Sequence, residues 1–192
     1  KYDGLAAGKW VDICESQDHA ESSIKNLLKP NESIIVEDFI KGIELSSIYI
    51  CNPNASKKTI GLPWVKDYKS RDEYNSGPNT GGMGAITHPY CSFKKNDVYS
   101  LNTEIEKIII KTIVSINNSS GDQSNYNGFL YLGLMISTED SKPYLLEYNC
   151  RMGDPETQNL IMYLYNNDVD FLDLIGFNLS LIHISEPTRP QA

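Results

Sequence analysis

The sequence predicts a mixed fold of the α+β or α/β class, with helices and strands sharing one core. Apolar residues recur every three or four positions from Asp97 to Asn117, which is the spacing of an amphipathic helix. Gly128–Ser137 and Pro143–Asn149 are apolar and β-rich, and the short polar stretch between them predicts a hairpin. The chain has 192 residues and no internal repeat, which fits one domain of ordinary size.

The remaining elements follow from local patterns. Helical spacing and a capping aspartate predict a helix from Asp18 to Leu28. The apolar run Ser33–Phe39 predicts a buried strand, and Glu44–Cys51 predicts another. Four glycines and two prolines in Asn75–Pro89 predict a loop. A last helix is expected to begin near Asp154-Pro155, since proline is favoured in a first turn.

Composition excludes several classes of function. The formal net charge is −8, and the chain has no block rich in Lys and Arg, so a nucleic-acid partner is not expected. Apolar runs stay well short of the ~20 residues that span a bilayer, so no membrane partner is expected. The absence of a secretory signal and four widely spaced cysteines fit reduced thiols in the cytoplasm. These are Cys14, Cys51, Cys91 and Cys150.

Lys1–Lys9 has the composition of a phosphate-binding loop. Its glycines and alanines let backbone N–H groups approach phosphate oxygens, and its lysines add positive charge. The glycine spacing differs from a Walker A loop, and Trp10 stands where Ser or Thr would bind magnesium. Taken alone, the segment also fits an ordinary turn.

Ile34–Glu44 is an apolar strand that ends in acidic residues. A hinge of extended backbone in this stretch can present a C=O and an N–H to an adenine edge, and Glu44, seven residues past Glu37, could accept hydrogen bonds from ribose hydroxyls. A solvated acidic turn between strands explains the pattern equally well.

The strongest local pattern lies in Leu145–Glu156. In a strand, Glu147 and Asn149 point to the same face, and their oxygens suit Mg²⁺. Arg151 continues the alternation, and its guanidinium could hold a phosphoryl group or an acyl phosphate. An exposed strand end with mixed charges is the alternative.

The glycine-rich stretch Gly77–Ala85 is costly in chain entropy unless it wraps a ligand or a neighbouring backbone. A mobile surface linker is the other interpretation. Asp67-Tyr68-Lys69 precedes it and could add one basic group.

Together these segments resemble the phosphoribosylamine–glycine ligases of the ATP-grasp superfamily. The resemblance covers about Lys1 to Asn178, and its most specific parts are Gly77–Ala85 and Gly153–Gln158. It implies an α+β ATP-grasp fold, incomplete at both ends, in which two subdomains clasp ATP. Residues 1–43 would belong to the small subdomain and 44–178 to the large one. Residues 179–192 are similar to a translated sequencing adapter, although a genuine tail is the alternative.

The resemblance also implies an activity. ATP would phosphorylate glycine to glycyl phosphate, and the amine of 5-phosphoribosylamine would attack it, giving glycinamide ribonucleotide, ADP and phosphate. This is a step of purine biosynthesis, and the partners would be small-molecule substrates.

Site residues carry over from the same resemblance. ATP would contact Lys1, Gly4, Leu5, Ala6, Ala7, Gly8, Lys9, Glu37, Asp38, Phe39, Ile40 and Glu44. Mg²⁺ or Mn²⁺ would be held by Glu147 and Asn149, while Lys69 and Arg151 would be catalytic. The substrate-binding set would be Asp67, Asn79, Thr80, Gly81, Gly82, Met83, Gly84, Asp154, Pro155 and Glu156.

Two other functions stay open, and three departures from the family pattern are evidence for the second of them, a nucleotide-binding module. Trp10 replaces a glycine, Tyr68 a histidine and Ser70 an arginine. Another ATP-grasp carboxylate–amine ligase is one alternative, and a screen of acceptor amines would distinguish it. A nucleotide-binding module without chemistry is the other, and it would bind Mg·ADP without amine-dependent ATP consumption. The chain alone is expected to be inactive or a poor catalyst.

Overall fold

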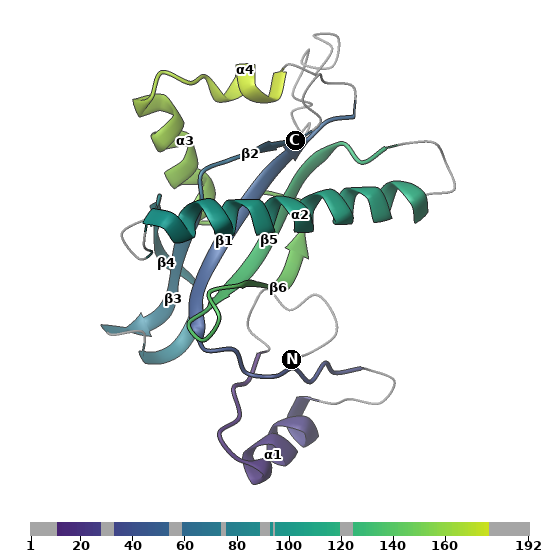
Figure 1. Ribbon diagram of the computed structural model, residues 1–192. Helices are drawn as coiled ribbons and strands as arrows, with labels where there is room; N and C mark the ends of the chain where they lie inside the picture. Colours follow the sequence, from purple (N-terminus) through teal and green to yellow (C-terminus); the bar gives the residue numbers. More distant parts are fainter. Residues whose placement is uncertain are drawn as a thin grey trace, which may run out of the picture.

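A computed structural model gives the fold (Figure 1) and describes residues 11–27, 33–53, 59–73, 76–88, 93, 95–119 and 125–176. The predicted adapter-like tail lies outside these residues. The described elements, in chain order, are α1 (Gln17–Leu27), β1 (Gly42–Cys51), β2 (Thr59–Gly61), β3 (Val65–Asp72), β4 (Ser76–Thr87), α2 (Lys95–Ser119), β5 (Gly128–Ser137), β6 (Pro143–Asn149), α3 (Glu156–Asn166) and α4 (Phe171–Gly176).

The strands form one six-stranded sheet in the order β4-β3-β1-β5-β6, and β2 pairs with β1. The strand pairs are antiparallel, which assigns the fold to the α+β class. The predicted hairpin is confirmed, because β5 and β6 have the predicted bounds and pair directly.

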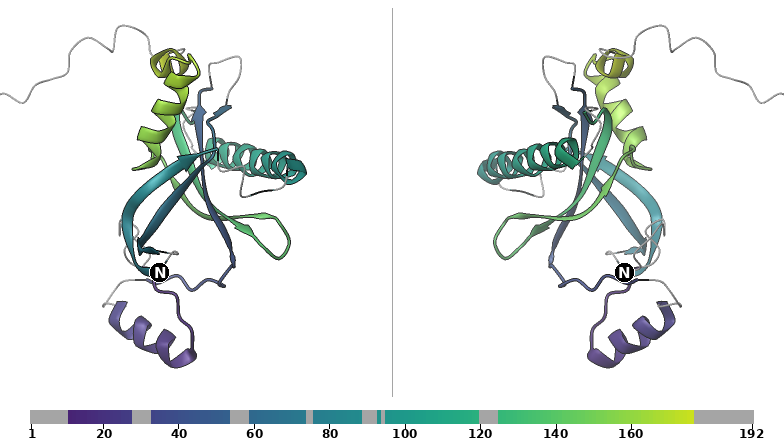
Figure 2. Two further views of the ribbon diagram at one scale, coloured as in Figure 1. Left: turned by 90° about the vertical axis from the view of Figure 1, so that its left-hand side faces the viewer. Right: turned by 90° about the vertical axis from the view of Figure 1, so that its right-hand side faces the viewer.

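Helices cover both faces of this sheet (Figure 2). Side chains alternate along β1, so Leu45 and Tyr49 face α2 while Ile48 faces α3. On the first face, α2 buries a stripe of Leu101, Ile105 and Ile109. On the second face, Leu160 of α3 packs against Ile48, Val65 and Tyr131. The sheet is therefore the shared wall of two apolar clusters.

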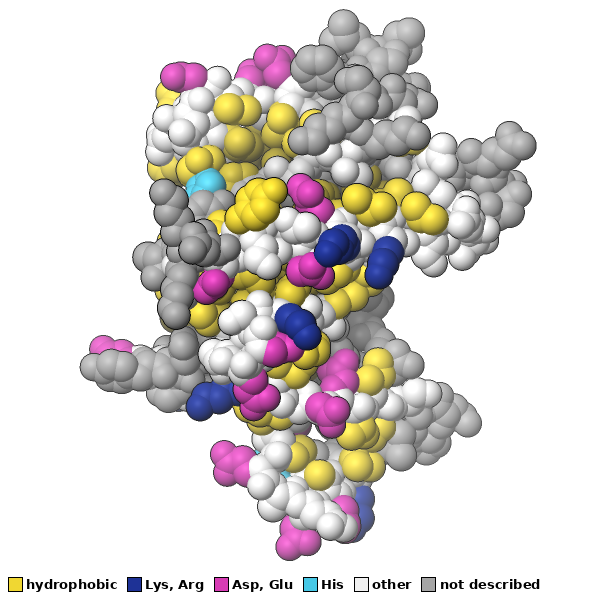
Figure 3. Space-filling model, viewed as in Figure 1, with side chains coloured by type: hydrophobic (Ala, Val, Ile, Leu, Met, Phe, Trp, Pro, Cys, Tyr) yellow, Lys and Arg dark blue, Asp and Glu magenta, His cyan; other side chains and the backbone are white. Residues whose placement is uncertain are grey.

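The outer side of α2 carries mixed side chains (Figure 3). Lys107 donates to Glu104 at 2.6 Å, while Ile110 and Val114 are more than half exposed. Such a surface is a normal solvated helix face. Among the described residues, no helix is both long and apolar enough to cross a membrane.

The predicted buried strand Ser33–Phe39 is wrong. Ile34 forms a single bridge, the rest of the segment has no strand structure, and Val36 is 80% exposed and Phe39 72%. The segment connects α1 to β1 at a distance from the sheet (Figure 1). Its apolar pattern gives a buried strand only where a neighbouring strand and a covering layer exist, and the described residues supply neither.

The predicted loop over Asn75–Pro89 is also wrong, because Ser76–Thr87 forms β4 and pairs with β3. The glycine-rich part of β4 forms a bulge, which lets the strand stay paired with β3 on either side of it. Ser70 pairs with Asn79 and Tyr68 with Gly84, so Thr80–Met83 lie opposite Lys69 alone. Gly82 and Gly84 have φ values of 137° and 156°. Glycine tolerates such values, and the segment therefore stays paired at both ends of the bulge.

Candidate functional site

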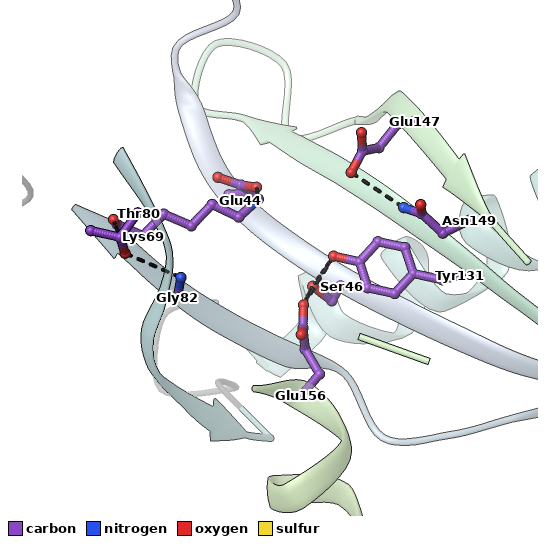
Figure 4. A network of polar contacts seen from close by, with 9 residues as sticks. All are labelled: Glu44, Ser46, Lys69, Thr80, Gly82, Tyr131, Glu147, Asn149 and Glu156. Atoms are coloured by element: carbon purple, nitrogen blue, oxygen red, sulfur yellow. Dashed lines mark hydrogen bonds and ion pairs between the residues drawn. The ribbon is translucent and has the colours of Figure 1, made fainter. Parts of the chain in front are cut away.

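Polar side chains gather on one face of the sheet, the face that α3 partly covers (Figure 4). Glu44 and Ser46 reach it from β1, and Lys69 reaches it from β3. Glu147 and Asn149 reach it from β6, since Glu147 pairs with Gly133 and Asn149 with Tyr131. Alternation along antiparallel strands therefore brings distant parts of the sequence together.

Lys69 and Glu44 form an ion pair across β3 and β1. Both side chains are about one third exposed. Burial lowers the pKa of Lys69, but attraction to Glu44 and the hydrogen bond to it outweigh this, so its pKa is raised overall. Lys69 is therefore a fixed positive charge at neutral pH. The two residues were predicted to have separate roles, Lys69 as a catalytic group and Glu44 as a ribose ligand, and the fold makes them partners.

Glu147 and Asn149 lie side by side, with Asn149 Nδ2 donating to Glu147 Oε1 at 3.3 Å. A Cβ at position 133 would lie 3.1 Å from Glu147 Cγ, so Gly133 makes room for this side chain. Glu147 is exposed on the sheet edge. A carboxylate and an amide oxygen that are open to solvent fit Mg²⁺ or Mn²⁺, provided that the amide turns its oxygen toward the ion.

Glu156 is buried at the start of α3 and binds two hydroxyls of the sheet. Its Oε1 accepts hydrogen bonds from Ser46 Oγ at 2.9 Å and Tyr131 OH at 3.0 Å, and these two hydroxyls are 2.8 Å apart. All three residues are at most 5% exposed. Burial raises the pKa of Tyr131, and Glu156 raises it further, so the phenol keeps its proton. The three residues fix α3 to β1 and β5.

Asp67 lies between the bulge of β4 and the start of α3. It is 8% exposed, and its buried Oδ1 accepts no hydrogen bond from the described residues. A Cβ at Gly82 would lie 3.3 Å from this oxygen and 2.5 Å from Pro155 Cδ. Burial and then Glu156 raise the pKa of Asp67 to about 6, although Lys69 opposes them.

Thr80 attaches the bulge to β3. Its Oγ1 donates to the Lys69 carbonyl oxygen at 2.9 Å and accepts from the Gly82 N–H at 3.1 Å. Farther along, Asn159 of α3 donates to the Ala85 carbonyl oxygen. The predicted substrate segment is thus held from two sides. Met83 is 60% exposed, and the Asn79 side chain is outside the described part of the chain.

Two other predicted site residues, near the start of α3, make their polar contacts within their own segment. Arg151 is exposed and donates to the Met152 carbonyl oxygen at 2.9 Å. Asp154 accepts from Gln158 at 2.8 Å. The predicted adenine hinge, Glu37–Ile40, lies in the segment before β1 and is mostly exposed. The predicted phosphate loop, with Lys1, Gly4, Leu5, Ala6, Ala7, Gly8 and Lys9, lies outside the described residues.

Three polar residues of this region were not predicted from the sequence: Ser46, Tyr131 and Asn159. Ser46 interrupts an otherwise apolar strand, which was the one available signal. Tyr131 and Asn159 fit the apolar strand and the helix in which they occur, so their polar contacts depend on the tertiary fold.

The fold and the polar face define an ATP-grasp domain. The family model for the phosphoribosylglycinamide synthetase ATP-grasp (A) domain matches residues 1–157, and the chain therefore belongs to this family. Membership implies the use of ATP.

Named relatives agree with this assignment. A phosphoribosylamine–glycine ligase of Clostridium acetobutylicum is 39% identical over 92% of this chain and 40% of its own length. One from Vibrio parahaemolyticus is 32% identical over 100% of this chain and 43% of its own length. The crystal structure of the Thermotoga maritima enzyme aligns with a TM-score of 0.68 at 34% identity, covering 84% of this chain and 39% of that one. The chain thus spans about 40% of the length of these relatives.

Proposed function

We propose that this chain supplies ATP-binding and catalytic groups of a phosphoribosylamine–glycine ligase. The reaction joins glycine to 5-phosphoribosylamine and gives glycinamide ribonucleotide, ADP and phosphate through glycyl phosphate. The observation that carries the proposal is the single polar face on which Glu44, Lys69 and Glu147 converge beside Asp67. The relatives' names support the choice of substrates. Both substrates are small polar molecules, and we propose that the enzyme works in the cytoplasm.

Two subdomains, residues 1–43 and 44–178, would share the binding of ATP. The backbone of Gly4–Lys9 and the ammonium group of Lys1 hold the phosphates, and Glu37–Ile40 contact the adenine. Glu44 binds the ribose while keeping Lys69 in position, which its ion pair with Lys69 supports.

Glu147 and Asn149 would hold Mg²⁺ or Mn²⁺. The bound ion would neutralise charge on the transferring phosphoryl group. The adjacent oxygens on an open sheet edge support this assignment.

The same face would position glycine and the amine. Lys69 supplies a positive charge for the carboxylate or acyl phosphate, and Arg151 would reach the phosphoryl group from the end of β6. The bulge, Asn79–Gly84, and Asp154–Glu156 would surround the acceptor. The contact between Gly82 and Pro155 supports this part of the proposal, because it joins the two segments.

ADP release by a full-length ligase carrying these residues tests the function. We expect release only when glycine and phosphoribosylamine are both present, and a loss of at least about 100-fold in Glu147→Ala. Glu139→Ala removes an exposed carboxylate in the β5–β6 turn and should leave the rate unchanged. If ADP is released with a different amine but not with phosphoribosylamine, the chain belongs to a ligase with another acceptor. Mg·ADP binding without any amine-dependent release would identify a nucleotide-binding module instead.

A further inference from the structure

The two segments most specific to this family meet at one carboxyl group. The glycine bulge of β4 covers Asp67 from one side, and the ring of Pro155 lies against Gly82. Glu156 follows directly and is among the groups that raise the pKa of Asp67. Segments about seventy residues apart in the sequence therefore create the surroundings of Asp67.

Asp67 differs from the other carboxylates of this face. Glu44 is paired with Lys69, Glu147 receives the Asn149 amide, and Glu156 receives two hydroxyls. Among these four described carboxylates, Asp67 has the buried oxygen without a donor. The Tyr68 backbone hydrogen bond favours the Asp67 anion, but burial and the negative charges of Glu156 and Glu44 outweigh it, so this carboxyl readily takes up a proton.

Charges on three elements act on Asp67. Glu156 of α3 and Glu44 of β1 raise its pKa, and Lys69 of β3 lowers it, while burial is the largest cause of the upward shift to about 6. A proton acceptor with a pKa near the working pH is the most effective kind. Glu156 cannot turn away from Asp67 freely, because Ser46 and Tyr131 hold its carboxylate.

We propose that Asp67 accepts the proton lost by the attacking amine and that Glu156, held by Ser46 and Tyr131, increases its proton affinity. The inference rests on the proposed function. The amine lone pair forms the C–N bond at the acyl carbon, and the C–O bond to phosphate breaks with its electron pair leaving on phosphate. The nitrogen, now positively charged, passes one proton to the Asp67 carboxylate, which later releases it to solvent.

The pH dependence of kcat/KM for the amine in the full-length ligase is the first test. The carboxylate form is the active form, so the rate should fall as the pH drops through the pKa of Asp67. Asp67→Asn should lower kcat by about 10²–10⁴-fold and abolish this acid limb. Glu156→Gln removes a negative neighbour and should move the limb to lower pH, by roughly one unit. Glu139→Gln should change neither.

A second measurement tests whether Asp67→Asn impairs only the attack of the amine. It reports whether the variant still folds and still forms glycyl phosphate from ATP and glycine. Glycine-dependent scrambling of an oxygen-isotope label in ATP reports acyl phosphate formation without the amine, and Asp67→Asn should retain it. The carboxyl ¹³C resonance of Asp67 in the 192-residue chain should titrate near 6 and shift to lower pH in Glu156→Gln.

The outcomes distinguish the two proposals. If the wild-type enzyme shows no ADP release that requires both glycine and phosphoribosylamine, the proposed function is wrong. An active wild type whose Asp67→Asn variant keeps its kcat and acid limb overturns only the role of Asp67. An unchanged limb and resonance in Glu156→Gln overturns the role of Glu156.

Discussion

Gly82 occupies a conformation and a space that a larger residue does not fit. Its φ is 137°, and an added Cβ would lie 2.5 Å from Pro155 Cδ. Gly81, its neighbour in the same bulge, has nothing within 4 Å of an added Cβ. The two glycines therefore serve different purposes: Gly82 allows the bulge to approach Asp67 and Pro155, whereas Gly81 lies in open space.

This difference gives a prediction at the residue scale. Gly82→Ala should lower the free energy of unfolding by about 1–3 kcal/mol, because it adds backbone strain and a clash. Gly81→Ala should change it by no more than about 1 kcal/mol, and in the stabilising direction if its backbone tolerates alanine. Urea unfolding of both variants measures this. If Gly82→Ala and Gly81→Ala destabilise the protein equally, position 82 does not require glycine more than position 81 does.

At the scale of elements, the attachment of β4 to α3 depends on the side chain of one residue. β4 is an edge strand, and α3 holds it through Asn159, which donates to the Ala85 carbonyl oxygen and accepts from Thr87 Oγ1 at 3.5 Å. The neighbouring Gln158 is exposed and contacts Asp154 instead. Two adjacent side-chain amides of α3 therefore differ: that of Asn159 binds β4, and that of Gln158 faces solvent.

Asn159→Ala should loosen β4. Losing the amide leaves the Ala85 carbonyl oxygen without that donor, which should cost about 1–3 kcal/mol and speed hydrogen exchange along β4. Gln158→Ala should cost no more than about 0.5 kcal/mol. Denaturant unfolding and amide exchange, measured on both variants, provide the comparison. Unchanged exchange in β4 of Asn159→Ala would contradict the attachment.

Elements with strong internal patterns were predictable, and those defined by their neighbours were not. The helix over Asp97–Asn117 and the β5–β6 hairpin have complete periodicity within their own sequence. Ser33–Phe39 has a strand-like composition, but apart from the single bridge at Ile34 the described residues give it no adjacent strand that would bury it. β4 has a loop-like composition, yet its backbone pairs with β3.

The site divides in the same way. Glu147 and Asn149 were predicted to share a face from their spacing alone, and they do. Ser46, Tyr131 and Glu156 come from three elements, so no local pattern contains their contact. The pairing of Lys69 with Glu44 likewise depends on the register of β3 beside β1.

At the scale of the whole molecule, stability is expected to be uneven. β1 and β5 lie at the centre of the sheet between two apolar clusters. α1 lies away from the sheet (Figures 1 and 2), and among its described side chains only Ser23 is buried. Ser23 contacts Asp12, which is itself outside the sheet. Within the described residues, α1 therefore lacks the apolar burial that stabilises β1.

Amide hydrogen exchange should reveal this difference. α1 has 11 residues, and helices shorter than about 12–15 residues are marginal in water without tertiary packing. Its amides should exchange through local opening, with protection several kcal/mol below that of β1 and β5, whose exchange requires global unfolding. Adding a low concentration of urea should therefore speed exchange in β1 and β5 while barely affecting α1, because local opening exposes little new surface. Equal protection and equal urea dependence in α1 and β5 would mean that the helix unfolds together with the sheet.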